Sequence, residues 1–260
     1  MPGDAYATHP TGLQIRFVEK DHAYTDANGQ HYESVTTFIK RFFKPFDEDG
    51  EILRRKAAEA NLTPEQLQAQ WRAKGAAACD YGTRCHETAE SKLLRGVQIH
   101  QPRDEKERTA FACVASTVEW LLSRFRFIAT EQIVFSPAYA LAGSIDLLMA
   151  DDANRVLWVL DWKTNAEIPK VNNWNQKALA PIQHLDDCAF AKYALQLATY
   201  QRIIEHDGYL RASGLDGYKI NRALIHIPPN ATNAEWLPTP DLGREVVEMI
   251  LAKFTDLLPF

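Results

Sequence analysis

The feature that most constrains the fold is a strand-like run, R-V-L-W-V-L-D-W-K, at residues 155–163. Alternate side chains of a strand point to opposite faces, so Asp161 and Lys163 are same-face neighbours. A second apolar run, A-L-A-G-S-I-D-L-L-M-A, comes directly before it and carries Asp146. An antiparallel register that sets Asp146 opposite Val159 or Asp161 brings all three charges to one face.

Three charges on one face of an apolar hairpin make a poor core but a good reaction site. Two carboxylates that reach a common point bind a hard cation such as Mg²⁺, and an adjacent ammonium stabilises charge on an attacked phosphate. The D-x-K spacing is weak by itself, because Asp104-Glu105-Lys106 repeats it in a hydrophilic segment where a solvated helix start is expected. The apolar strand context therefore carries the prediction of a phosphodiester-hydrolysing site.

The remaining chain alternates between helical and strand-like patterns. Residues 13–19 and 30–33 are predicted to form a hairpin about the turn Asn28-Gly29. Further predicted elements are helices near 34–43, 50–60, 64–95, 104–125, 191–205 and 242–258, and strands at 127–135 and 222–228. The expected fold is α/β, with a central mixed sheet that contains an antiparallel meander and is flanked by helices. A mainly helical N-terminal elaboration, residues 1–80, is expected to pack on a core of residues 81–260.

Composition limits the partners and the location. The chain has 260 residues and a formal net charge of -5, so it is not coated with positive charge for non-specific nucleic-acid binding, although a local basic groove remains open. No apolar run approaches the ~18 residues of a membrane span, and the first residues lack the pattern of a secretory signal. No membrane partner and a cytoplasmic location are therefore expected. The four cysteines form no C-x-x-C pair, so they predict neither a zinc knuckle nor a disulfide framework.

Two helical segments each present a pair of polar side chains one turn apart. His86 and Glu90 lie on one face of the helix predicted around residue 86, and Gln196 and Tyr200 lie on one face of a later helix. Each pair has a plain alternative. The first is a surface His/Glu pair, and the second is an amphipathic helix with a partly buried tyrosine.

The order of these motifs resembles the RecB-like branch of the PD-(D/E)xK nuclease superfamily. The motifs are G-x-x-x-H-x-x-x-E at 82–90, G-x-x-D at 143–146, D-x-K at 161–163 and Q-x-x-x-Y at 196–200. The opening segments and residues 184–197 are similar to mitochondrial genome maintenance exonucleases and their viral and phage relatives. Ile145 stands where the superfamily's name has proline, which is common in this branch.

The resemblance implies a restriction-endonuclease-like core and specific residue roles. The implied metal ligands, for Mg²⁺ or Mn²⁺, are His86, Asp146, Asp161 and the main-chain carbonyl of Trp162. Lys163 would contact the scissile phosphate and the attacking water, and Glu90 would support a ligand or bind a second metal ion. The residues implied to contact nucleic acid are Ser34, Thr36, Gln196 and Tyr200. For Ser34 and Thr36 a plain helix N-cap is the open alternative.

Further candidates lie outside these motifs. Glu131, on the strand before the G-x-x-D motif, is an additional acidic group near the metals. A local basic field is expected from Arg84 with Lys40, Arg41, Lys44, Arg54, Arg55, Arg72 and Lys74, and base stacking from Phe42, Phe43, Trp71 and Trp174. Relatives with an iron–sulfur cluster use three cysteines after the nuclease core. No cysteine follows Cys188, so no such cluster is expected.

These observations predict a metal-dependent DNA exonuclease that acts on ends or single strands in recombination, repair or replication. Two alternatives stay open, a catalytically silent nucleic-acid-binding scaffold of the same fold and a nuclease for RNA or flap structures. Expected partners are single-stranded or end-bearing DNA, with a homo-oligomer or a phage or host recombination protein as further candidates. A phage-encoded chain would work in the host cytoplasm.

Overall fold

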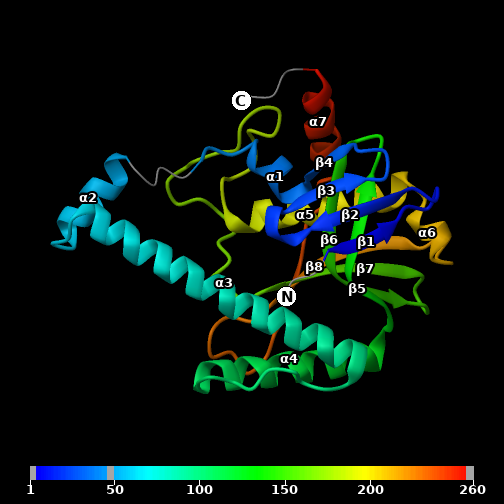
Figure 1. The fold of residues 1–260 in the computed structure, drawn as a ribbon, viewed down its shortest axis with the longest axis horizontal. Helices are drawn as coiled ribbons and strands as arrows, with labels where there is room; N and C mark the ends of the chain where they lie inside the picture. Colours follow the sequence, from blue (N-terminus) through cyan, green and yellow to red (C-terminus); the bar gives the residue numbers. More distant parts are fainter. Residues whose placement is uncertain (1–3, 46–49, 256–260) are drawn as a thin grey trace.

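A nine-stranded mixed sheet organises residues 4–45 and 50–255, which are the residues that the computed structural model describes (Figure 1). Its order is β1-β2-β3-β4-β6-β7-β8-β9, and β5 pairs with β6 outside this path. The β4–β6 and β7–β8 pairs are parallel and the others antiparallel. The strands are β1 (Ala5–Thr8), β2 (Gln14–Val18), β3 (Ala23–Asp26), β4 (His31–Ser34), β5 (Arg126–Ser136), β6 (Leu141–Asp151), β7 (Val156–Lys163), β8 (Lys219–His226) and β9 (Glu235–Pro238).

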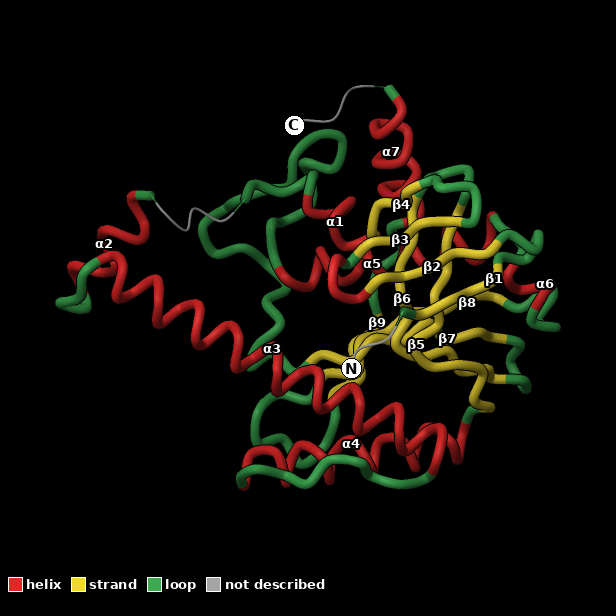
Figure 2. Tube along the Cα trace, viewed as in Figure 1, coloured by secondary structure: helices red, strands yellow, loops and turns green. Residues whose placement is uncertain are grey.

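Helices cover both faces of this sheet (Figure 2). They are α1 (Val35–Lys40), α2 (Glu51–Glu59), α3 (Pro64–Arg95), α4 (Glu105–Arg124), α5 (Ala189–His206), α6 (Tyr209–Ala212) and α7 (Gly243–Phe254), with a 3-10 turn at Glu19–Asp21. Helices α1, α5 and α7 pack on one face through the largest apolar cluster, and α3 with α4 packs on the other through a second cluster. Within the described part of the chain, no helix is both long enough and apolar enough to cross a membrane. The predicted α/β architecture with its central mixed sheet is confirmed.

Helix α3 carries the chain from the sheet out to a separate tip. It begins at a capping box, in which the Thr63 side chain accepts from the Gln66 backbone N–H, and it ends at Gly96 with φ 68°. Residues 72–80 are exposed along their whole length, and the first half of α3 extends away from the sheet to α2 in Figure 1. The proposed division at 80/81 falls inside this continuous helix.

The N-terminal segment contains more strand than the sequence indicated. The predicted pairing of 13–19 with 30–33 is wrong, because β2 pairs with β3 and β3 pairs with β4. The turn at Asn28-Gly29 is correct but joins β3 to β4. Strand β1 was not predicted. At four or five residues each, these strands are too short for alternation to identify partners reliably.

The meander of β5, β6 and β7 follows the predicted order and positions the charged residues. The β6–β7 register pairs Leu147 with Leu160 and Leu148 with Val159. One further step of this register sets Asp146 beside Asp161, which is one of the two registers expected from the sequence.

Gly143, of the G-x-x-D motif, sits against the ring of Tyr200 on α5. A Cβ atom at Gly143 would lie 2.7 Å from the ring edge and 2.8 Å from the hydroxyl of Tyr200. We expect Gly143→Ala to lower the free energy of unfolding by about 1–3 kcal/mol, the usual range for overpacking. Urea denaturation followed by circular dichroism measures the change.

The matched control is Gly75→Ala on the exposed part of α3, where a Cβ would meet nothing within 4 Å. Alanine favours a helix over glycine by about 1 kcal/mol, so this variant should be as stable as the parent or more stable. Equal stability of the two alanine variants would contradict the contact between Gly143 and Tyr200.

Candidate metal centre

Three carboxylates lie in a row across neighbouring strands of the meander. The β5–β6 register on either side sets Glu131 opposite Asp146. The β6–β7 pairing ends at Leu147 and Leu160, which directly adjoin Asp146 and Asp161 in the sequence. The charge of Asp146 acts on Asp161. Because facing residues of adjacent strands have Cβ atoms ~5 Å apart, the row gathers like charges at close range. Without a cation or proton to compensate the charge, the repulsion between these carboxylates would destabilise the folded state.

Glu131 departs from regular strand geometry at this point. Its φ is 48°, in the left-handed region that non-glycine residues rarely adopt. The hydroxyl of Ser144 donates a hydrogen bond of 3.1 Å to its carboxylate. Local strain of this kind costs about 1–3 kcal/mol and concentrates at functional sites. The backbone therefore turns the Glu131 side chain toward the acidic row at a cost.

His86 comes to the same place from helix α3. Its Nε2 atom lies 3.0 Å from the carbonyl oxygen of Trp162, and its Nδ1 atom lies 3.4 Å from Oδ2 of Asp146. The backbone N–H of Trp162 donates a 2.9 Å hydrogen bond to the same Asp146 oxygen. The imidazole thus bridges the motif strands β6 and β7, although it lies 76 residues from Trp162 in the sequence.

The donor atoms of His86, Glu131 and Asp146 all lie within 4.8 Å of one another. Opposite ligands of an octahedral Mg²⁺ are ~4.2 Å apart, given bonds of ~2.1 Å, so a small contraction would let one ion bind all three. One imidazole nitrogen and two carboxylate oxygens form a donor set that suits Mg²⁺ or Mn²⁺. These three residues therefore fit a divalent cation such as Mg²⁺ or Mn²⁺.

Asp161 lies outside this closest donor set and forms an ion pair with Lys163. The pair is largely buried, with side-chain exposures of 4% for Asp161 and 16% for Lys163. The Lys163 ammonium also lies 4.6 Å from the centre of the Tyr193 ring. Its position is therefore fixed from two sides, next to the metal-binding donors.

The electrostatics of the cluster raise the pKa values of two of its acids. Partial removal from water and the charge of Asp146, with smaller effects of Glu90 and Asp161, raise the pKa of Glu131 to about 8. Burial and the charge of Asp146 raise the pKa of Asp161 to about 6, against the opposing effect of Lys163. A bound divalent cation would replace these protons and stabilise the ionised carboxylates.

Lys163 keeps its charge despite its burial. Burial alone would lower its pKa, but the negative charges of Asp161 and Asp146 outweigh burial and raise the pKa. The side chain is thus a permanent cation beside the acidic row.

Most of the other predicted residues lie near the cluster. Glu90 is close enough to Glu131 for its charge to affect that residue's pKa, and Gln196 donates a 3.3 Å hydrogen bond to the Tyr200 hydroxyl. Ser34 and Thr36 line a cavity next to Glu131. The Ser34 hydroxyl accepts the backbone N–H of Thr37 at 3.1 Å, as the N-cap of α1.

Arg84 is not brought to the cluster. Its guanidinium forms two hydrogen bonds with Glu107, of 3.0 and 3.1 Å, and a third with the carbonyl of Gln101. Glu107 is itself buried, and Arg84 together with Arg103 compensates its charge. The position of Arg84 on α3 therefore serves to dock α4.

Two of the four aromatic residues proposed to stack on bases belong to the apolar core instead. Phe42 and Phe43 are buried in the main apolar cluster and cannot stack on bases. Trp174 is 81% exposed in the segment that follows β7.

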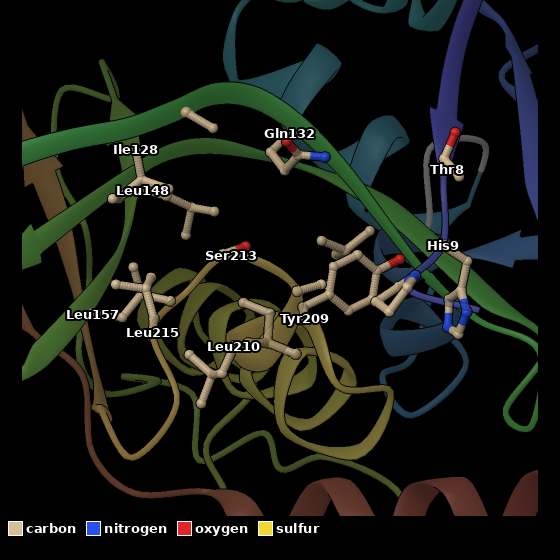
Figure 3. A pocket seen from close by; sticks show the side chains of 15 residues that line it. Thr8, His9, Ile128, Gln132, Leu148, Leu157, Tyr209, Leu210, Ser213 and Leu215 are labelled. Carbon is tan, nitrogen blue, oxygen red and sulfur yellow. The ribbon is translucent and has the colours of Figure 1, made fainter. Parts of the chain in front are cut away.

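A separate cavity of about 450 Å³ lies between the sheet and α6 (Figure 3). Its walls are mainly aliphatic, with Ile128, Leu148, Leu157 and Leu215 among them. None of the residues predicted for the site lines this cavity. The described residues that line it include neither Asp nor Glu, so it lacks the carboxylates that a hard cation prefers and is distinct from the metal centre.

Comparisons with known proteins give one family match. The family model for the PD-(D/E)XK nuclease superfamily matches residues 33–253. A search of curated proteins found no match. Among solved structures, a candidate exonuclease from Eubacterium rectale is similar at a TM-score of 0.39 and 11% identity, over 87% of this chain and 80% of that chain.

Proposed function

The chain belongs to the PD-(D/E)XK nuclease superfamily, and we propose that it is a metal-dependent exonuclease that hydrolyses phosphodiester bonds of DNA. The observation that carries the proposal is the convergence of His86, Glu131 and Asp146, one imidazole and two carboxylates from three elements, within 4.8 Å. The Asp161–Lys163 pair lies alongside. Such an arrangement suits hydrolysis of a polyanion, because cation and ammonium together compensate the charge of the attacked phosphate.

A divalent cation bound by these side chains would supply a water of lowered pKa and neutralise charge on the phosphate. The protein's own groups provide the geometry. The backbone of Trp162 orients both His86, through its carbonyl, and Asp146, through its N–H. Lys163 would hold a phosphate oxygen or the attacking water, and Asp161 keeps the ammonium in place. Glu131, with its pKa of about 8 in the metal-free protein, would release its proton when the cation binds.

The alternatives predict different behaviour. A silent scaffold of the same fold would bind nucleic acid without cutting it, and the intact charged row disfavours this case. A nuclease for RNA or flaps would use the same cluster, so substrate comparison is needed to separate it from a DNA exonuclease.

A labelled-end assay tests the proposal. Oligonucleotides of DNA and of RNA, single- and double-stranded and labelled at either end, are incubated with the full chain and Mg²⁺, Mn²⁺ or excess chelator. We expect metal-dependent cutting of DNA with products that shorten from one end. Internal cutting would indicate an endonuclease, faster cutting of RNA would overturn the DNA assignment, and binding without cutting would favour the scaffold.

A further inference from the structure

One hollow is lined by a member of the acidic row, and a second lies just past the end of β7. At the β5 end lies a cavity of about 320 Å³, lined by Phe17, Glu19, His22 and Tyr24 of the β2–β3 segment and by Glu131 and Ser144. We name it the β-side hollow. At the β7 end lies a cavity of about 540 Å³, lined by Lys74, Tyr81, Lys106, Thr164 and Asn165. We name it the α3-side hollow.

The two hollows differ in charge. The described residues that line the β-side hollow include Glu19 and neither lysine nor arginine, and the other glutamate there, Glu131, belongs to the candidate metal-binding set. Those that line the α3-side hollow include Lys74 and Lys106 but no acidic residue. Because every internucleotide phosphate carries a negative charge, a continuing strand is favoured in the α3-side hollow and disfavoured in the β-side hollow.

The β-side hollow has the size and lining for one nucleoside. Its volume is at the lower end of the ~300–1,000 Å³ range of small-ligand pockets. Phe17 and Tyr24 stack on one another at 4.5 Å, and Phe17 is only partly buried, which leaves an aromatic surface facing the hollow. Stacking on such a surface contributes about 1–3 kcal/mol per base with little sequence preference. Ser34 and Thr36 add hydroxyl groups that can meet a sugar.

Residues of the N-terminal strands and of the turn between β2 and β3 line this side of the centre. Strands β1 to β4 continue the sheet beside β6, and they are seen in front of β5 and β6 in Figure 1. Glu19 and His22 come from the turn between β2 and β3 and form the outer rim. The hollow beside the metal centre therefore has room for about one nucleoside.

We propose that the β-side hollow receives the terminal nucleoside of the substrate, with a free hydroxyl at its end, while the rest of the strand lies in the α3-side hollow. This inference rests on the proposed nuclease function and specifies its substrate. A terminal phosphate would bring about two negative charges next to Glu19, and the described residues that line the hollow include no lysine or arginine to compensate them. The enzyme thus prefers hydroxyl ends and releases mononucleotides.

The test uses pairs of single-stranded DNA oligonucleotides that differ only in a hydroxyl or a phosphate at the 5′ or the 3′ end. At the end from which cutting proceeds, we expect the hydroxyl form to be cut about tenfold faster. The first labelled product should be a mononucleotide. Equal rates, preference for the phosphate form or oligonucleotide first products would each overturn the inference.

A charge-reversal variant tests whether the charge of Glu19 sets this preference. Glu19→Lys should reduce or reverse the preference for hydroxyl ends, because it places an ammonium at the rim. The control Asp216→Lys makes a similar change at an exposed turn before β8, at the other end of the β7–β8 pair from the metal centre, and should keep the parent's preference. An unchanged preference in Glu19→Lys would contradict the inference. If the parent chain cuts no nucleic acid with any metal, the proposed function itself fails, which is a distinguishable result.

Discussion

Replacement of Asp161 by asparagine is expected to reduce metal-dependent cleavage by about 100- to 1000-fold, the cost of removing one group that stabilises transition-state charge. Asp161 holds the Lys163 ammonium next to the acidic row, and the carboxamide cannot hold it as strongly. Lys163→Ala should lose a similar factor. Because the two side chains act as a pair, the double variant should be little worse than either single variant. Single-turnover rates with saturating Mn²⁺ or Mg²⁺ measure all three.

The sequence contains its own matched control in the second D-x-K tripeptide. Asp104 accepts the backbone N–H of Glu107 at 2.8 Å as the N-cap of α4, and asparagine caps a helix about as well as aspartate. Asp104→Asn should therefore keep the parent's rate. Circular dichroism of each variant checks that it folds, because a buried lysine left without Asp161 lowers stability. A fully active Lys163→Ala protein, or an equally impaired Asp104→Asn protein, would contradict the assignment.

The meander and its register could be predicted because their determinants are local. Strand alternation fixes which side chains share a face, and the β6–β7 turn limits the register to a few choices, one of which sets Asp146 beside Asp161. Helix α3 was predicted at its observed bounds, 64–95, because its helical pattern is long. The N-terminal strands are short, and their pairing depends on tertiary contacts that no local pattern contains.

The candidate site was predictable only in part, for the same reason. Glu131 could be named as an acid on the right strand, but its left-handed backbone and its alignment with Asp146 emerge only when β5 pairs with β6. Arg84 sits within the first family motif, yet its guanidinium pairs with Glu107, 23 residues away. A motif fixes the position of a residue in the chain but not the direction of its side chain. Charged residues near a motif therefore need a structure before they receive a role.

Divalent metal ions are expected to stabilise the fold strongly, and more so at pH 8 than at pH 5.5. At a metal concentration 100 times the dissociation constant, binding adds about 2.7 kcal/mol to the free energy of unfolding. For a chain of this size that corresponds to a rise in Tm of about 5–10 °C. The metal competes with protons on Glu131 and Asp161, so its affinity increases as pH rises through their pKa values of about 8 and about 6. Thermal denaturation with Mn²⁺ or Mg²⁺ against chelator measures the effect, and Asp146→Asn should greatly reduce it.

The metal-free protein should show the opposite pH dependence at this site. The folded state keeps protons on Glu131 and Asp161 at pH values where the unfolded chain, with pKa values near 4.5 and 3.8, has lost them. Stability from these groups therefore falls as pH rises from about 4 to about 8. Glu131→Gln cannot ionise, so its metal-free stability relative to the parent should increase across this range, whereas Glu119→Gln, on an exposed side chain of α4, should show no such trend. The contrary result is a parent chain that loses no stability relative to Glu131→Gln between pH 5.5 and 8. It would mean that the carboxylates of the acidic row do not repel one another strongly, and that no cation is needed to compensate them.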